Sequence, residues 1–205
     1  MCNDGAVQTE SARTRSVNDT RSLILDVALE VLGQNPDAGM GDIASAAGVV
    51  RRTVYGHFPT RADLVRTLTQ RAVDEIVTVL TEVNASDGAA ETVWVDFVAR
   101  VWPLARRYRV LLALRRGEHG AEIHALLAPV DTILADLVRR GQDTQVFARH
   151  LPADILSQLA YAAVFSIADA HLSRGTLDAR AATITSLLVL GVPEPRAQTL
   201  VDARP

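Results

Sequence analysis

Apolar residues recur every three or four positions along most of the chain, which is the period of an α-helix with one buried face. The first such pattern begins after Asp19 or Thr20, either of which can cap a helix, and it ends before Gly33. The later patterns are separated by Gly, Pro or polar residues. They predict two short helices on either side of Gly48 and helices over 61–83, 91–102, 104–115, 121–140, 152–171 and 179–190. We therefore expect an all-α fold of about nine helices.

The two ends of the chain lack this pattern. Residues 1–17 are polar and aperiodic, so they predict a disordered tail. Pro193 and Pro195 predict a stop after the last helix, with frayed residues beyond it. Between these ends we expect two domains, over residues 18–66 and 67–195.

The two short helices meet at Gly48, where a tight turn needs a positive φ that Gly adopts without steric cost. Val54 and Phe58 lie four residues apart and anchor the second short helix, so Arg52 and Gly56 point away from the core. Long donors and a flat ring on an exposed short helix suit phosphates and base edges. The pattern predicts a helix-turn-helix whose second helix contacts DNA.

Composition changes this picture in two respects. The 205 residues are 48% hydrophobic, which is enough for a sizeable core, and the abundance of Ala and Leu favours helices. The net charge of −3 means that the chain as a whole does not attract nucleic acid. Between Gly48 and Asp63, however, there are three Arg and one His and a single acidic residue. All 21 basic residues are Arg, so any phosphate or guanine contact is made by planar forked donors.

The sequence gives little support for other classes of protein. The lone Cys2 excludes an intrachain disulfide, the five His residues lack metal-ligand spacing, and no glycine-rich phosphate or nucleophile motif occurs. No apolar run approaches the roughly 18 to 20 residues of a membrane span, and the N-terminus does not have the pattern of a signal peptide. We therefore expect a cytoplasmic protein that is not an enzyme and has no metal site, no cofactor and no membrane partner.

Three segments resemble the signature of tetracycline-repressor-type (TetR family) regulators: Gly48-Val49, residues 53–58 and residues 60–64, with Thr20-Arg21 upstream. The resemblance covers residues 20–66. It implies an all-α homodimer with N-terminal DNA-binding domains and C-terminal domains that bind a small effector. Together with the exposed face of the second short helix, it predicts the DNA-binding residues Arg21, Arg51, Arg52, Thr53, Tyr55, Gly56, His57, Thr60 and Arg61.

The chain departs from the family pattern at three glycines. Gly39-Met40-Gly41 stands where members often carry Thr, an apolar residue and Arg, so a cap hydroxyl and a phosphate contact are missing. Gly56 replaces a larger side chain that touches DNA in members of the family. We therefore expect modest DNA affinity from this surface.

Aromatic residues are rare in this chain, and six of the nine fall in the C-terminal helices. Ordinary core packing is the default interpretation of each one, and the functional alternative is an apolar cavity between helices. The predicted effector site consists of Trp94, Phe97, Trp102, Leu127, Tyr161 and Phe165.

These observations predict a transcriptional regulator, a repressor that a small hydrophobic effector releases from a near-palindromic DNA operator. Effector entry would shift the helix over 61–83 and change the spacing of the two recognition helices. The homodimer would form through the last two predicted helices, over 152–171 and 179–190. The alternative is a helical ligand-binding or catalytic protein whose DNA-binding role has decayed, and Gly39, Gly41 and Gly56 keep that alternative open.

Overall fold

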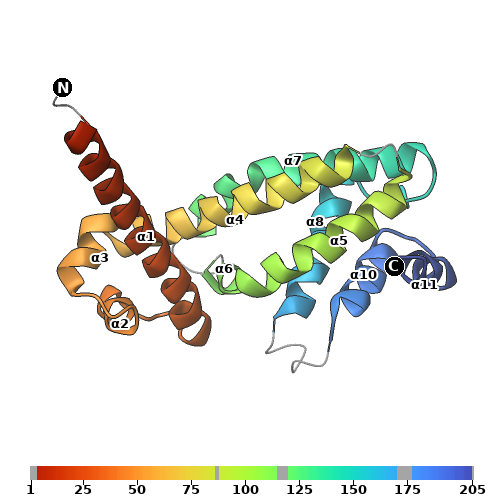
Figure 1. The fold of residues 1–205 in the computed structure, drawn as a ribbon. Coiled ribbons are helices and arrows are strands. Elements are labelled where there is room, and N and C mark those ends of the chain that lie inside the picture. The colour runs from red at the N-terminus through yellow and green to blue at the C-terminus, as the bar shows by residue number, and fades with distance from the viewer. Residues whose placement is uncertain (1–3, 86–87, 115–119, 170–176, 205) are drawn as a thin grey trace. The chain divides into compact units, whose positions relative to one another are not determined.

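The structure is a computed structural model that describes residues 4–85, 88–114, 120–169 and 177–204. Every regular element in these ranges is an α-helix, which confirms the predicted fold class (Figure 1). None of these helices combines the length and hydropathy that a membrane span requires. The helices are α1 (Asp4–Gln34), α2 (Met40–Ala46), α3 (Arg51–His57), α4 (Arg61–Asn84), α5 (Ala90–Arg107), α6 (Val110–Leu114), α7 (Gly120–Asp143), α8 (Ala153–Ala168), α10 (Ala179–Val189) and α11 (Glu194–Asp202).

The chain divides into two compact units, Met1–Leu68 and Thr69–Pro205. The division lies close to the boundary expected at residue 66. The first turns of α4 belong to the first unit and the rest of α4 to the second.

The first unit is built on apolar residues at helical spacing in α1, joined by residues from the next three helices. All of them are fully buried, and each Val, Leu or Ile among them contributes about 1.5–3 kcal/mol relative to exposure. They are Ile24, Ala28, Leu32, Ile43, Val54, Leu64 and Leu68.

α1 begins earlier than the sequence predicted. It starts at Asp4 and passes through Asp19 and Thr20 without a break, so neither residue caps a helix and the expected disordered tail over 1–17 is helical from Asp4. The segment has no apolar stripe, but it holds good helix formers such as Ala6 and Ala12. Extending an existing helix adds one hydrogen bond per residue and needs no new nucleus. The periodicity of apolar residues gives no information about such an extension.

In the second unit, α8 packs against α7 and α10, and α5 packs against α7, α8 and α10 (Figure 1). The sequence predicted a break near Pro103, but α5 continues through it to Arg107. Proline removes one backbone hydrogen bond. Val101 and Ala105 are both fully buried, so side-chain packing on either side of Pro103 holds the helix together.

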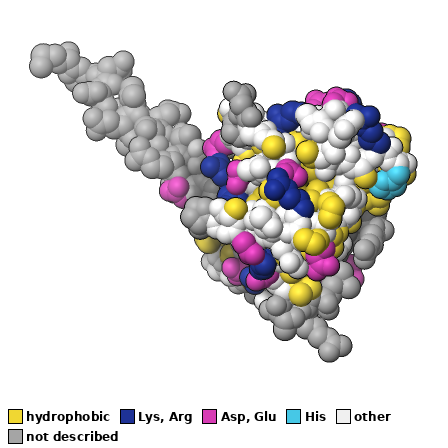
Figure 2. All heavy atoms as spheres, turned by 90° about the vertical axis from the view of Figure 1, so that its right-hand side faces the viewer, with side chains coloured by type: hydrophobic (Ala, Val, Ile, Leu, Met, Phe, Trp, Pro, Cys, Tyr) yellow, Lys and Arg dark blue, Asp and Glu magenta, His cyan; other side chains and the backbone are white. Residues whose placement is uncertain are grey.

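α11 corrects the prediction of a stop and a frayed end. Pro195 lies in its first turn, where a helix does not need the missing N–H. Arg196 donates hydrogen bonds to the nearly buried carboxylate of Glu91 on α5, and Ala197 is fully buried. Figure 2, in which α11 faces the viewer, shows arginine and acidic side chains next to each other on this surface. Ion pairs with residues far away in the chain therefore stabilise α11, in a segment where the local sequence predicted that helical structure ends.

Candidate nucleic-acid interface and effector cavity

α3 turns one apolar side chain inward and its polar side chains outward. Val54 is the buried residue of the helix, and Phe58, which follows the helix and is also buried, closes it by donating its N–H to the carbonyl of Val54 at 2.8 Å. Both predicted anchors are confirmed. The outward positions are Arg51, Arg52, Tyr55 and Gly56, which are exposed, with Thr53 and His57 half-buried at the edges.

The turn between α2 and α3 fixes where this outward surface begins. Gly48 has a φ of +66°, as predicted, and the N–H of Val49 donates to the carbonyl of Ala44 at 3.0 Å. Val50 then stands at the N-cap of α3, where its side chain makes no capping hydrogen bond and is 70% exposed. Sequence reasoning did not single out Val50. The available signal was an apolar residue at a cap position that usually holds Ser, Thr, Asp or Asn.

Arg21 is exposed and lies against Phe58 at the edge of the first unit. Its guanidinium lies over the ring of Phe58, 5.1 Å from the ring centroid, and Nη2 is 3.5 Å from the hydroxyl of Thr67. A cation over an aromatic face is held in place by the quadrupole of the ring. The Arg21 guanidinium thus contacts Phe58, and a DNA contact by Arg21 remains a prediction.

Two further predicted DNA-binding residues already have partners in this unit. Thr60 and Asp63 form a capping box at the start of α4: the Thr60 hydroxyl donates to Asp63 at 2.6 Å and accepts from the Asp63 N–H at 3.1 Å. The hydroxyl bond is the main reason that the pKa of Asp63 lies below its usual range. Arg61 donates to the carbonyls of Pro36 and Ala38 in the loop before α2. Phosphate binding by Thr60 or Arg61 would have to compete with these bonds.

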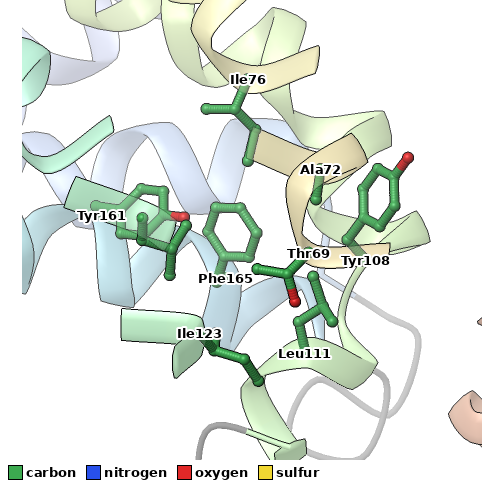
Figure 3. A pocket seen from close by; sticks show the side chains of 9 residues that line it. Thr69, Ala72, Ile76, Tyr108, Leu111, Ile123, Tyr161 and Phe165 are labelled. Atoms are coloured by element: carbon green, nitrogen blue, oxygen red, sulfur yellow. The ribbon is translucent and has the colours of Figure 1, made fainter. Parts of the chain in front are cut away.

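A small apolar cavity of about 20 Å³ lies in the second unit (Figure 3). Three residues of the predicted effector site, Leu127, Tyr161 and Phe165, lie in its wall. The Tyr161 and Phe165 rings tilt against each other with centroids 4.6 Å apart. The remaining wall residues, which sequence reasoning missed, are Thr69, Ala72, Ile76, Tyr108, Leu111 and Ile123.

The other three predicted effector residues lie outside this cavity. Trp94 is fully buried, donates its indole N–H to the hydroxyl of Ser186 at 3.0 Å and packs edge-on against Phe97. Trp94 and Phe97 are therefore core residues, and Trp102 is partly exposed and does not line the cavity either. Aromatic content alone identified these residues, and it does not tell which side of α5 faces a cavity and which faces α10.

Comparisons with known proteins agree with this geometry. Residues 24–68 match the profile described as "Bacterial regulatory proteins, tetR family". The chain is 51% identical over 55 residues to the HTH-type transcriptional repressor LfrR of Mycolicibacterium smegmatis, and 42% identical over 52 residues to the HTH-type transcriptional regulator AcrR of Shigella flexneri. These matches span 29% and 24% of the length of the two relatives.

The likeness in structure extends further along the chain. The crystal structure of the TetR-like regulator LfrR from Mycobacterium smegmatis, in complex with proflavine, superposes with a TM-score of 0.68 at 25% identity. It covers 88% of this chain and 96% of that one. Both units therefore have counterparts in a solved structure, whereas the family profile matches residues 24–68, within the first unit.

Proposed function

Because the chain belongs to the tetR family of bacterial regulatory proteins, we propose that it is a DNA-binding transcriptional repressor that a small apolar effector releases from its operator. The orientation of α3 is the observation that carries this proposal. Val54 and Phe58 hold the helix to the first unit, while Arg51, Arg52 and Tyr55 extend from its exposed side. A short helix held in this way can enter the major groove and place its first residues against base edges.

The exposed side chains divide by their chemistry. Arg52 lies opposite the Val54–Phe58 anchor, and its fork matches O6 and N7 of guanine, a contact worth about 1–3 kcal/mol. Tyr55 is 50% exposed and presents a flat ring with a hydroxyl. Arg51, Thr53 and His57 border these two and would contact the phosphates on either side of the groove.

The cavity in the second unit would bind the effector. None of the described residues that line it carries a charge, so an uncharged and largely apolar molecule fits its chemistry. Its volume of about 20 Å³ is about that of one water molecule, whereas pockets for drug-sized ligands measure roughly 300–1,000 Å³. An effector would therefore have to displace side chains, and the Phe165 ring lies in the middle of the site (Figure 3).

α4 would transmit the effect of binding. Thr69, Ala72 and Ile76 recur on one side of α4 and form part of the cavity wall. The same helix begins at Arg61 in the first unit. An effector that pushes these side chains outward would move α4 and so change the separation of the two recognition helices in a dimer.

A homodimer would form through α8 and α10. Ile155, Leu159 and Leu188 are large apolar residues on these helices that stay exposed in the protomer. Four other apolar residues of these helices are buried within the protomer: Leu156, Ala160, Val164 and Leu187. A twofold pairing of α8 and α10 as a four-helix bundle would cover the exposed set. Two recognition helices related by such an axis favour a near-palindromic operator with half-sites roughly 34–36 Å apart.

Fluorescence anisotropy tests the DNA-binding part of the proposal. The full-length protein is titrated into a labelled duplex from the promoter beside its own gene and into a scrambled duplex of the same composition. A repressor should bind the promoter duplex at least about 10³-fold more tightly at physiological salt. Equal affinity for the two duplexes, or no binding to either, would exclude sequence-specific regulation by this chain.

Nile red, a neutral apolar dye, tests the effector part. Dye bound in the cavity should fluoresce strongly and lower the affinity for the promoter duplex. By linkage, the promoter duplex should lower the dye affinity by the same factor. Dye binding that leaves DNA affinity unchanged would separate the cavity from regulation.

A further inference from the structure

The guanidinium of Arg51, at the start of α3, lies next to Gly41 on α2. A Cβ atom added to Gly41 would lie 2.6 Å from Nη2 and 2.9 Å from both Cζ and Nε of Arg51. Real Cβ atoms essentially never come within 3.0 Å of another heavy atom. The guanidinium therefore fills the space that any side chain at position 41 would need.

Arg51 lies there without using its hydrogen-bonding capacity. Within the described part of the chain, none of its N–H groups donates a hydrogen bond and no carboxylate pairs with it. Arg61 differs, because it donates to two loop carbonyls, and Arg21 lies over an aromatic ring. Arg51 thus combines a position next to Gly41 with donors that remain available on an exposed residue.

We propose that Gly41 is a positioning residue for DNA binding: its missing side chain lets α2 hold the Arg51 guanidinium in place as a preformed phosphate ligand. This inference rests on the proposed DNA-binding function. A guanidinium that is already confined loses less rotamer freedom when a phosphate binds, and its planar fork matches two phosphate oxygens.

A glycine at position 41 lowers the stability of α2. Glycine inside a helix is less favourable than alanine, so a purely structural account has no reason to prefer Gly41. The atoms that a new Cβ would meet are the far end of a flexible side chain, and they can move away. Gly41→Ala should therefore fold normally and displace only the Arg51 guanidinium.

A double-mutant cycle in the full-length protein tests the inference with the promoter duplex as probe. Arg51→Ala should weaken binding about tenfold and lower the slope of log K against log salt by about 0.9, as for one lost phosphate contact. Gly41→Ala should weaken binding about threefold or more in the wild-type background and have no effect in the Arg51→Ala background. Additive losses, or wild-type binding by Gly41→Ala, would overturn the inference.

Gly39→Ala is the matched control on the same helix end. The nearest atom to a Cβ at Gly39 is Oδ2 of Asp42, at 3.7 Å, which is an ordinary contact. This variant should bind the promoter duplex like the wild type. Arg51→Lys provides a second test, because a lysine ammonium has no plane to lie against Gly41. It should bind less tightly than the wild type and be insensitive to Gly41→Ala, and wild-type affinity would count against a positioned guanidinium.

A measurement without DNA separates this inference from the proposed function. The side-chain Nε–Hε order parameter of Arg51, measured by NMR in the free protein, should fall in Gly41→Ala. An unchanged order parameter would overturn the positioning role even if the protein binds its promoter. If instead the wild type fails to prefer its promoter duplex, the proposed function fails, and the inference about DNA binding fails with it.

Discussion

The phenol of Tyr108 donates a hydrogen bond to Oε1 of Glu75, with the two oxygens 2.7 Å apart. Glu75 lies on α4, whereas Tyr108 directly follows α5 and forms part of the cavity wall. Burial raises the pKa of the phenol well above its usual range, and the carboxylate of Glu75 raises it further. The bond ties α4 to a second part of the wall of the proposed effector cavity.

Tyr108→Phe should lower the free energy of unfolding by about 1 kcal/mol at neutral pH, because the bond is lost and the ring is kept. In the wild type, the unfolded phenol ionises near its usual pKa of 10, while the folded phenol stays protonated to higher pH. Stability from this group is therefore present below pH 10 and falls as the pH rises above it. Denaturant unfolding between pH 7 and 11 measures this slope. An equal loss of stability above pH 10 in Tyr108→Phe would assign the slope to another group.

The cavity wall on α4 should control dye binding. Ala72→Val narrows a space of about 20 Å³, so it should weaken Nile red binding, and overpacking should cost about 1–3 kcal/mol of stability. Phe97→Leu is the control, because Phe97 is fully buried but does not line the cavity. Fluorescence titration compares the two variants. Equal dye affinities would place the dye elsewhere.

Arg61 and Arg52 should differ in stability as well as in DNA binding. Arg61→Ala removes hydrogen bonds to Pro36 and Ala38, so it should lower the stability of the first unit by about 1–2 kcal/mol. Arg52→Ala should leave thermal unfolding unchanged and relax preference at one base pair by about 1–3 kcal/mol. Calorimetry and anisotropy on single-base variants of the promoter duplex measure the two effects. An unchanged melting temperature for Arg61→Ala would mean that the hydrogen bonds to Pro36 and Ala38 do not stabilise the first unit and do not keep Arg61 from a phosphate.

The proposed dimer should depend on the exposed apolar residues of α8 and α10. Leu159→Glu places a charge in the centre of the proposed interface, and multi-angle light scattering should then report a monomer. Gln158→Glu adds the same charge at an exposed neighbouring position of α8 and should leave the dimer intact. If both variants remain dimeric, the dimer interface lies on another surface of the protomer.

Val50→Ser should stabilise the first unit. A serine at the N-cap of α3 can accept a hydrogen bond from a free N–H of the first turn, which is worth about 0.5–1 kcal/mol, and the exposed valine contributes little burial. The melting temperature should rise. If Val50 contacts a thymine methyl group in the major groove, the same change should lower promoter affinity. A lower melting temperature would show that the valine side chain has packing partners that outweigh the cap.

Local signals predicted the helix-turn-helix well. The spacing of Val54 and Phe58 identified the buried side of α3, and the positive φ of Gly48 followed from the turn. Asp178 is a residue type that favours the N-cap position, and its carboxylate accepts a hydrogen bond from the N–H of Ala181 at 2.9 Å at the start of α10. These features depend on residues within four positions of each other, so the sequence alone contains the information.

Features that depend on distant partners could not be predicted in this way. α11 follows two prolines, and the ion pair of Arg196 with Glu91, far away in the chain, helps to hold it. The cavity wall shows the same limit, because Trp94 and Tyr161 are both aromatic and buried, yet only Tyr161 lines the cavity. Helix periodicity identifies a buried face but does not identify the element that covers it.

The sequence by itself determined the all-α class, the helix-turn-helix and the side chains that α3 exposes, because helical period, caps and turn glycines act over a few residues. Only the tertiary structure decided which of the exposed arginines keep their donors available. Arg61 donates to two carbonyls in the preceding loop, whereas the Arg51 guanidinium lies in the space that a side chain at Gly41 would fill. The three-dimensional position of each guanidinium, which neither residue type nor spacing encodes, sets that difference.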